Sequence, residues 1–176
     1  MTEATETSPP EPTRKGVRRV LLLLLLALIA LVVVTALSVD DWGRDLSTNR
    51  AWTSMDAAGS AEPMVVAGGV LEVEESLQRL CTARTNWTHE GHAAPPEDAK
   101  ATEGVEGPVL DTHHLVRATR LIGYKDDIWV IVESVDADSV RIHLESRSRV
   151  GRGDLGQNPR NLQELLAWLR EDLRAD

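Results

Sequence analysis

The feature that most constrains the fold of this chain is a run of uncharged, mostly apolar residues over 20–39, VLLLLLLALIALVVVTALSV. Its length matches the ~20 helical residues that cross the hydrocarbon core of a bilayer. A helix on the surface of a folded domain shows a polar stripe, and this run has none. The sequence therefore predicts a transmembrane helix over residues 20–39.

The charges that flank this run predict its orientation. Asp40 and Asp41 follow it, and four basic residues precede it: Arg14, Lys15, Arg18 and Arg19. Positively charged flanks stay in the cytoplasm, so the N-terminus is expected inside and everything after residue 39 outside. We therefore expect a single-pass protein of the cell membrane, with a disordered cytoplasmic tail over residues 1–19 and an extracytoplasmic C-terminal part.

A cleaved signal peptide is the alternative, because basic residues, an apolar stretch and small residues such as Ala36 and Ser38 are also its ingredients. The run is longer than the ~7 to 15 residues of a typical signal core, which favours a retained anchor. A lipoprotein is excluded, because no cysteine stands directly after the run to be acylated. The one cysteine of the chain, Cys81, also excludes an internal disulfide.

Two helices are indicated in the exported part. Apolar side chains recur at helical spacing over residues 70–81, and again along one face over residues 162–173. Asn158 and Pro159 predict the start of the second of these helices, as its N-cap and its first helical residue.

Strand patterns occupy the chain between these helices. A short strand is expected near Asn86 and an extended segment over 112–121. The long loop between them, residues 92–108, is either a lid over a site or a plain surface loop, and we favour the surface loop. Residues 128–132 are apolar on both faces, as in a central strand, and residues 140–145 alternate apolar and polar side chains, so the two form a hairpin. The predicted fold class is α+β, with an N-terminal transmembrane helix followed by a small two-layer domain that has an antiparallel sheet and a C-terminal helix.

Residues 40–62 connect the apolar run to this domain. With Trp42 and Trp52 near the membrane exit, the segment is typical of a juxtamembrane stalk. The extracytoplasmic α+β domain is then expected over residues 63–176, which is long enough for one core. The net charge of the chain is −9, so we expect no nucleic-acid partner.

The segment between the hairpin and the last helix, residues 146–161, is the densest functional candidate, with the sequence SRSRVGRGDLGQNPRN. Its glycines let backbone amides approach a ligand, a helix N-terminus favours an anion, and its arginines are suited to a carboxylate or a phosphate. A folding role is the alternative. In that case the glycines permit the turn, Asp154 pairs with an arginine and Asn158 caps the helix.

Residues in and before this segment follow the order of a known family. Asp126 and Asp127 open one strand, and the next strand and turn carry Arg147, Ser148, Arg149, Gly151, Asp154, Gly156 and Asn158. With these residues the chain resembles the domain of unknown function 1499 family over about residues 115–172, and more weakly over 41–49 and 70–86. The resemblance implies that these nine residues form one constellation in an exported, envelope-associated protein. It implies no known chemistry, and a Pro-Asn-Cys-Val segment that many relatives carry is missing here.

No cofactor and no metal site are expected. His89 and His92 lie in a polar loop approach, and the adjacent His113 and His114 would point to opposite faces of a strand. The chain also lacks a cysteine cluster and a helical H-E-x-x-H motif. For nucleophilic catalysis there is no G-x-S-x-G turn, and acid–base work by the Asp pair would need a pKa raised by burial.

Three functions follow from these patterns, in order of preference. The first is an envelope binding or scaffolding module that is anchored in the membrane and holds an anionic group, or an envelope protein partner, at the arginine- and glycine-rich turn. The second is a hydrolase or transferase that uses Asp126 or Asp127 with Ser148. The third is a purely structural domain, in which the same residues exist for folding.

Overall fold

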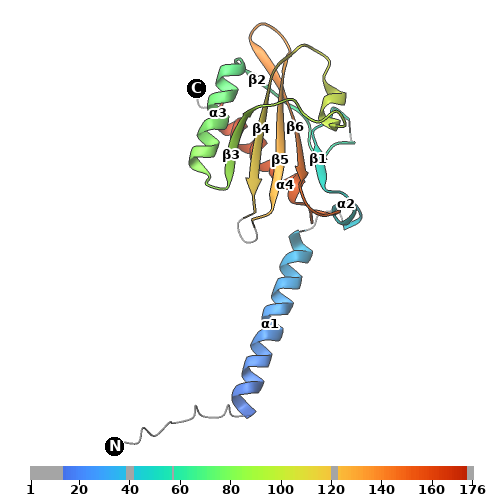
Figure 1. The fold of residues 1–176 in the computed structure, drawn as a ribbon, viewed down its shortest axis with the longest axis vertical. Helices are drawn as coiled ribbons and strands as arrows, with labels where there is room; N and C mark the ends of the chain where they lie inside the picture. Colours follow the sequence, from blue (N-terminus) through green and yellow to red (C-terminus); the bar gives the residue numbers. More distant parts are fainter. Residues whose placement is uncertain (1–13, 39–41, 57, 120–122, 174–176) are drawn as a thin grey trace, which may run out of the picture. The chain divides into compact units, whose positions relative to one another are not determined.

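The computed structural model describes residues 14–38, 42–56, 58–119 and 123–173. By their contacts the residues fall into two units, Met1–Val39 and Asp40–Asp176. The first unit contributes one helix, and the second holds the sheet and the other helices (Figure 1).

Helix α1, Arg14–Ser38, is long and apolar enough to cross a membrane. The window Lys15–Val34 has a mean hydropathy of 2.8, and none of it is buried. A signal sequence near an N-terminus has the same length and composition, so both an anchor and a signal sequence fit this helix. Residues 14–19 were predicted to be part of the disordered tail, but they form the first part of α1. The rest of that tail, 1–13, and Val39 lie outside the described residues.

The second unit is built on a six-stranded antiparallel sheet in the order β1-β6-β5-β4-β3 (Figure 1). Strand β2 also pairs with β6, so the short strands β1 and β2 lie one after the other along the same edge of β6. The hairpin of β5 and β6 that alternation predicts is confirmed. The strands are β1, Arg50–Trp52; β2, Met64–Ala67; β3, Trp87–His92; β4, Val109–Ala118; β5, Lys125–Ser134; and β6, Ser139–Ser148.

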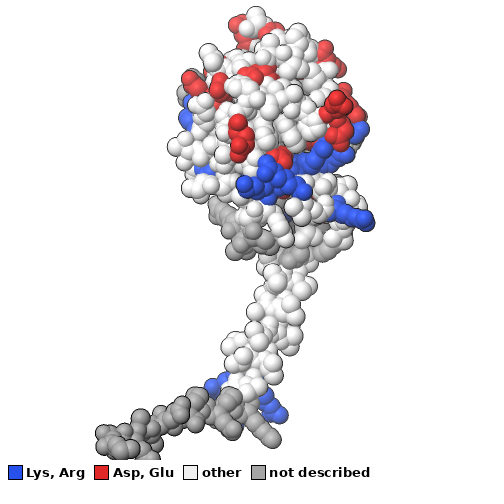
Figure 2. Space-filling view, viewed as in Figure 1, with Lys and Arg blue, Asp and Glu red and all other residues white. Residues whose placement is uncertain are grey.

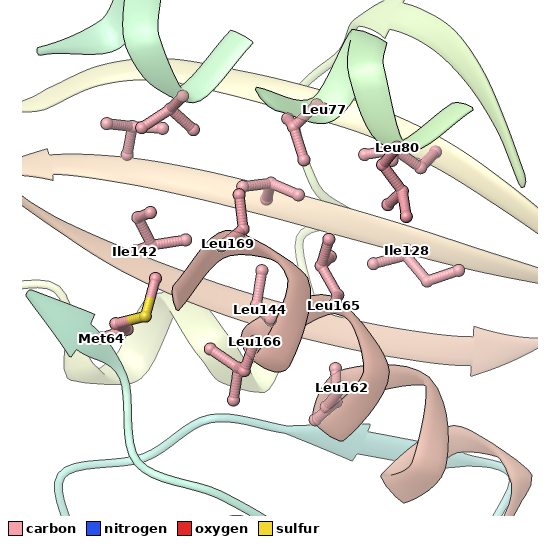
Figure 3. Close-up of a cluster of buried hydrophobic side chains, with 14 of the residues drawn as sticks. Met64, Leu77, Leu80, Ile128, Ile142, Leu144, Leu162, Leu165, Leu166 and Leu169 are labelled. Carbon is pink, nitrogen blue, oxygen red and sulfur yellow. The ribbon is translucent and has the colours of Figure 1, made fainter. Parts of the chain in front are cut away.

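Helices α3, Val70–Ala83, and α4, Gln157–Asp172, cover one face of this sheet, which confirms the two-layer α+β fold. Their apolar stripes meet the alternate side chains of β5 and β6 that point to the same face (Figure 3). Each leucine buried in this way stabilises the fold by about 1.5–3 kcal/mol. The core includes Met64, Leu77, Leu80, Ile128, Ile142, Leu144, Leu162, Leu165, Leu166 and Leu169.

The segment predicted as a stalk, residues 40–62, belongs in large part to the folded unit. Helix α2, Trp42–Ser47, is followed by β1, which pairs with the end of β6, and the side chain of Ala51 is fully buried. Asp45 in α2 is buried as well. This differs from the predicted stalk, because a strand of three residues shows too little alternation to be recognised in the sequence.

The long loop over residues 92–108 packs against the face of the sheet that the helices leave open. It contains a short 3-10 helix, η1, Lys100–Gly104, and the side chains of Ala99 and Ala101 are buried. The Ala101 amide donates a hydrogen bond to Oε2 of Glu145 on β6 at 3.1 Å. The loop therefore covers β6 in part and differs from the plain surface loop that the sequence favoured.

The single thiol of the chain, that of Cys81, lies on the half-buried side of α3. Burial raises the pKa of Cys81 to about 11. The thiol therefore stays protonated at neutral pH and is a poor nucleophile, as expected for a residue of the apolar stripe.

Candidate functional site

The nine residues singled out in the sequence lie where β5 begins, β6 ends and α4 begins. Strand pairing sets Asp126 opposite Ser148 and Asp127 opposite Arg147. Because neighbouring residues of a strand point to opposite faces, these two pairs lie on different faces of the sheet. The nine residues therefore form two groups, and not one constellation.

On the face that the helices cover, Asp126 belongs to a buried polar network. Its Oδ1 accepts a hydrogen bond from the Ser148 hydroxyl at 2.6 Å, and its Oδ2 accepts one from the Asn161 side-chain amide at 2.9 Å. Asp126 is only 2% exposed, so these bonds offset the hydration that the carboxylate loses. We call this group the polar network; it consists of Asp126, Ser146, Ser148, Asn158 and Asn161.

Asn158 lies at the centre of the polar network and is fully buried. Its side-chain amide donates hydrogen bonds to the carbonyl oxygen of Asn49 at 2.8 Å and to Oγ of Ser148 at 3.0 Å. Its Oδ1 accepts a hydrogen bond from the Ser146 hydroxyl at 2.6 Å. Asn158 therefore ties α4 to the end of β6 and to the residue that precedes β1.

Asp154 closes the turn that leads into α4. Its carboxylate accepts hydrogen bonds from the backbone N–H of Gly156 at 2.9 Å and of Asn158 at 2.8 Å. Gly156 is the N-cap, and its φ of 75° is a left-handed conformation that favours glycine. The prediction that Asn158 is the N-cap is therefore wrong, because Asp154 satisfies the helix amides from outside and the Asn158 side chain turns toward the sheet.

On the other face of the sheet, Asp127 is paired with Arg149. Nε and Nη2 of Arg149 donate to the two carboxylate oxygens at 2.8 and 2.7 Å. Nε2 of His114 lies 2.8 Å from Oδ1 of Asp127, and the His114 ring stacks on Trp129 with 5.4 Å between ring centroids. Burial raises the pKa of Asp127, but the hydrogen bonds from Arg149 and His114 outweigh burial and lower the pKa overall. The carboxylate therefore stays charged at neutral pH.

Arg147 is held by carboxylates in the same way. Its Nη1 donates to Asp98 at 3.1 Å, and its Nη2 donates to the buried Glu145 at 3.1 Å. Arg147 and Arg149 are thus both engaged by acids of the same domain. Figure 2 shows that several Lys and Arg side chains on one face of this unit lie close to Asp and Glu side chains. The arginine pair predicted to hold an anion is therefore already neutralised.

A pocket of about 330 Å³ opens beside the polar network. The predicted residues that line it are Asp126, Ser148, Gly151 and Asp154. Gly156 and Asn158 are buried next to it, at the start of α4. The pocket therefore gathers one of the two groups of predicted residues, and the arginines lie on the other face.

Three functional candidates at this pocket were missed in the sequence. Lys125 and Arg160 line the pocket and bring positive charge to it, and Asn161 belongs to the polar network. Asn161 carried a usable signal, because it follows Asn158 by three residues and so shares its helix face. No pattern marks the two cations, which lie far apart in the sequence and meet only in the fold.

Comparison with protein families gives one match. The model described as "Protein of unknown function (DUF1499)" matches residues 45–169. The chain belongs to the DUF1499 family. The matched range runs from α2 almost to the end of α4, so the polar network and the pocket are features of the DUF1499 domain. No curated protein and no solved structure matches this DUF1499 chain.

Proposed function

We propose that this DUF1499 protein is a membrane-anchored, extracytoplasmic binding module, and that the pocket beside the polar network holds an anionic group of its ligand. The observation that carries the proposal is the position of Lys125. Its side chain lines the pocket and, among the described residues, has neither a hydrogen bond nor an ion pair. Its charge is therefore available to a ligand, unlike that of Arg147 or Arg149.

Among the described residues, neither acid of the pocket wall, Asp126 or Asp154, forms an ion pair with Lys125. Asp126 accepts hydrogen bonds from Ser148 and Asn161, and Asp154 accepts hydrogen bonds from the first amides of α4. Hydrogen-bonded carboxylates of this kind form a fixed floor, because a fully satisfied polar network is rigid. A few fixed polar groups in a concave, partly apolar wall are typical of a ligand site.

The rim of the pocket indicates the rest of the ligand. Tyr124, Val150 and Leu155 line the pocket, and they are 55%, 65% and 41% exposed. Apolar side chains that stay in contact with water gain free energy when a ligand covers them. We therefore infer an acidic group attached to a short apolar chain, as in an envelope lipid or a lipid-like metabolite.

Replacing Lys125 by alanine is expected to weaken the binding of butyl phosphate about ten-fold, because a charge-assisted hydrogen bond contributes about 1.5 kcal/mol. The measurement is isothermal titration of the full-length chain in phosphatidylcholine nanodiscs. Inorganic phosphate is expected to bind more weakly than butyl phosphate, because it does not reach the apolar rim.

Lys100→Ala is the matched control for this experiment. Lys100 is an exposed lysine of η1 that pairs with Glu103 at 2.6 Å, outside the pocket. Its replacement is expected to leave the affinity unchanged. Equal affinities of the Lys125 and Lys100 variants, or no binding by the unaltered protein, would contradict the proposed anion site.

The anchor itself has a separate test. We expect α1 to be retained, so that the mature protein keeps residues 1–39. It should then stay in the membrane fraction after a carbonate wash, because the burial of an apolar helix in a bilayer is neither weakened by salt nor reversed by high pH. Protease added to intact cells is expected to digest the folded unit. A shorter, wash-released protein that begins near residue 40 would instead identify a cleaved signal sequence.

A hydrolase or transferase is the second candidate. It is supported by the 2.6 Å hydrogen bond from the Ser148 hydroxyl to Asp126 in the pocket wall. Asp127 points to the other face, and within the described residues no histidine is hydrogen-bonded to Ser148 or Asp126. Hydrolysis of an ester or phosphoester that Ser148→Ala abolishes and Lys100→Ala preserves would favour this candidate.

A further inference from the structure

A second group of titratable side chains lies at the edge of the sheet that β3 forms (Figure 1). His89 and His92 come from β3, Asp111 and His113 from β4, and Glu74 from α3. We call these five residues the histidine cluster. Asp111 and His113 lie near the start of β4, where the strand pairs with the second half of β5, so the cluster is distant along the strands from Asp126 and the pocket.

A β-bulge brings His89 and His92 to the same face of β3. Two residues that are three apart in a regular strand point to opposite faces. Here the pairing with β4 shifts register between His89 and Gly91, and Gly91 has a φ of 109°, which favours glycine. As a result, His92 pairs with His113, and the His89 and His92 rings lie 5.3 and 4.8 Å from the His113 ring.

His113 gives the first indication of a missing partner. It is fully buried, and within the described part of the chain neither of its ring nitrogens has a hydrogen-bond partner. The buried Nε2 of His89 also lacks one. Buried polar atoms are nearly always hydrogen-bonded, so unpartnered imidazole nitrogens at one place point to a ligand.

The chemistry of the His89 and His113 rings suits a metal ion. Imidazole is the commonest metal ligand among protein side chains. A neutral imidazole has a free electron pair on one nitrogen, which is the form that binds metal ions. Both rings are therefore prepared to act as ligands.

Asp111 adds a carboxylate to this set. Ligand atoms of His92, Asp111 and His113 all lie within 4.8 Å of one another. Oδ1 of Asp111 lies 2.9 Å from Nδ1 of His92, and Oδ2 lies 3.7 Å from Nε2 of His113. The side chain of His92 is 53% exposed, so an ion can reach the buried His113 from solvent.

We propose that His92, Asp111 and His113 bind a divalent transition-metal ion, with His89 beside them as a further imidazole. Two imidazoles and one carboxylate suit Zn²⁺ and similar ions, whereas Mg²⁺ and Ca²⁺ take oxygen ligands. With bonds of about 2.0–2.2 Å, ligand atoms around Zn²⁺ lie roughly 3.4 Å apart, so small rotations of side chains complete the site. The bound ion links side chains of the edge strand β3 and of its neighbour β4, in addition to the backbone pairing of the two strands.

The test uses the full-length chain in nanodiscs, stripped with EDTA and without a polyhistidine tag. Isothermal titration with Zn²⁺ is expected to show one site of micromolar or tighter affinity. Saturating Zn²⁺ is expected to raise the Tm of the folded unit, because an ion that binds only the folded state stabilises it. Co²⁺ in the same site is expected to give visible absorption that reports its coordination.

His92→Ala is expected to weaken Zn²⁺ binding at least about 100-fold, since even the loss of an outer-shell partner costs 10- to 100-fold. Because the His92 side chain is half exposed, this variant is expected to keep its fold. His114→Ala is the matched control. His114 is the neighbour of His113 on β4, but its ring stacks on Trp129 at the other face of the sheet. The His114→Ala variant is therefore expected to bind Zn²⁺ with the affinity of the unaltered protein.

Three results would overturn the proposal. The first is a Zn²⁺ affinity weaker than about 100 µM, and the second is the same Zn²⁺ affinity for His92→Ala and His114→Ala. A preference for Mg²⁺ over Zn²⁺ would overturn it as well, because that preference requires an oxygen ligand set. Lys125→Ala is expected to leave Zn²⁺ binding unchanged, since the pocket and the histidine cluster share no residue.

Discussion

Replacing Asn158 by alanine is expected to lower the free energy of unfolding by about 3 kcal/mol. The side chain is fully buried, and it is hydrogen-bonded to the Asn49 carbonyl, to Ser148 and to Ser146. Each bond contributes about 1 kcal/mol, and partners that stay buried without a bond add to the cost. Urea unfolding of residues 40–176, which contain the whole core, measures the change.

Asn86→Ala is the matched control for this prediction. Asn86 is half-buried, and its backbone carbonyl accepts a hydrogen bond from the Ala118 N–H at 2.9 Å, which the replacement keeps. A change below about 0.5 kcal/mol is expected for it. If Asn158→Ala were as stable as Asn86→Ala, the polar network would not hold α4 on the sheet.

The second large effect is expected at Glu133, a buried residue at the end of β5. Its Oε2 lies 2.7 Å from Nε2 of His143 and 3.2 Å from Nη1 of Arg141, and its Oε1 accepts a hydrogen bond from the Glu106 amide at 2.9 Å. Burial raises the pKa of Glu133, but these hydrogen bonds and one from the Gly107 amide outweigh it and lower the pKa to about 2.

This lowered pKa makes stability depend on pH. Between the folded pKa of about 2 and the ordinary value of 4.5, the unfolded chain binds more protons than the folded one. Glu133 therefore contributes about 3 kcal/mol to the free energy of unfolding above about pH 4.5, and this contribution is lost as the pH falls toward about 2. Glu133→Gln is expected to be less stable than the unaltered protein at neutral pH, with a difference that shrinks over this window. Urea unfolding at a series of pH values measures the difference.

Glu103→Gln provides the comparison for Glu133→Gln. Glu103 is an exposed acid of η1 that pairs with Lys100, and surface pairs of this kind contribute about 0–1 kcal/mol. Its variant is expected to follow the pH profile of the unaltered protein. A stability difference for Glu133→Gln that stays constant from neutral to acid pH would contradict the assigned pKa.

These experiments separate the proposed functions. A purely structural role for the residues around the turn predicts that Asn158→Ala destabilises the domain and that Lys125→Ala changes neither stability nor binding. The binding module predicts a loss of affinity for Lys125→Ala at unchanged stability. Lys125 is suited to this distinction because it is exposed and lies outside the polar network.

Much of the fold could be predicted from local patterns. The two-residue alternation over 140–145 and the helical spacing over 70–81 are properties of single elements, and both appear in the structure as β6 and α3. The fold class and the family follow from the same stretches of sequence. β1 could not be found in this way, because its three residues are a strand only through their pairing with β6.

The sequence by itself determined the apolar helix, the β5–β6 hairpin and the family. It also determined the helix that precedes this hairpin along the chain and the helix that follows it. Tertiary structure alone decided which side chains meet. Pairing of β5 with β6 separates Asp126 from Asp127 and directs Arg147 and Arg149 to acids on the open face. The bulge at Gly91 gathers histidines that a regular strand would keep apart. Both outcomes depend on long-range strand register, which sets the face of every side chain and leaves no mark in the local sequence.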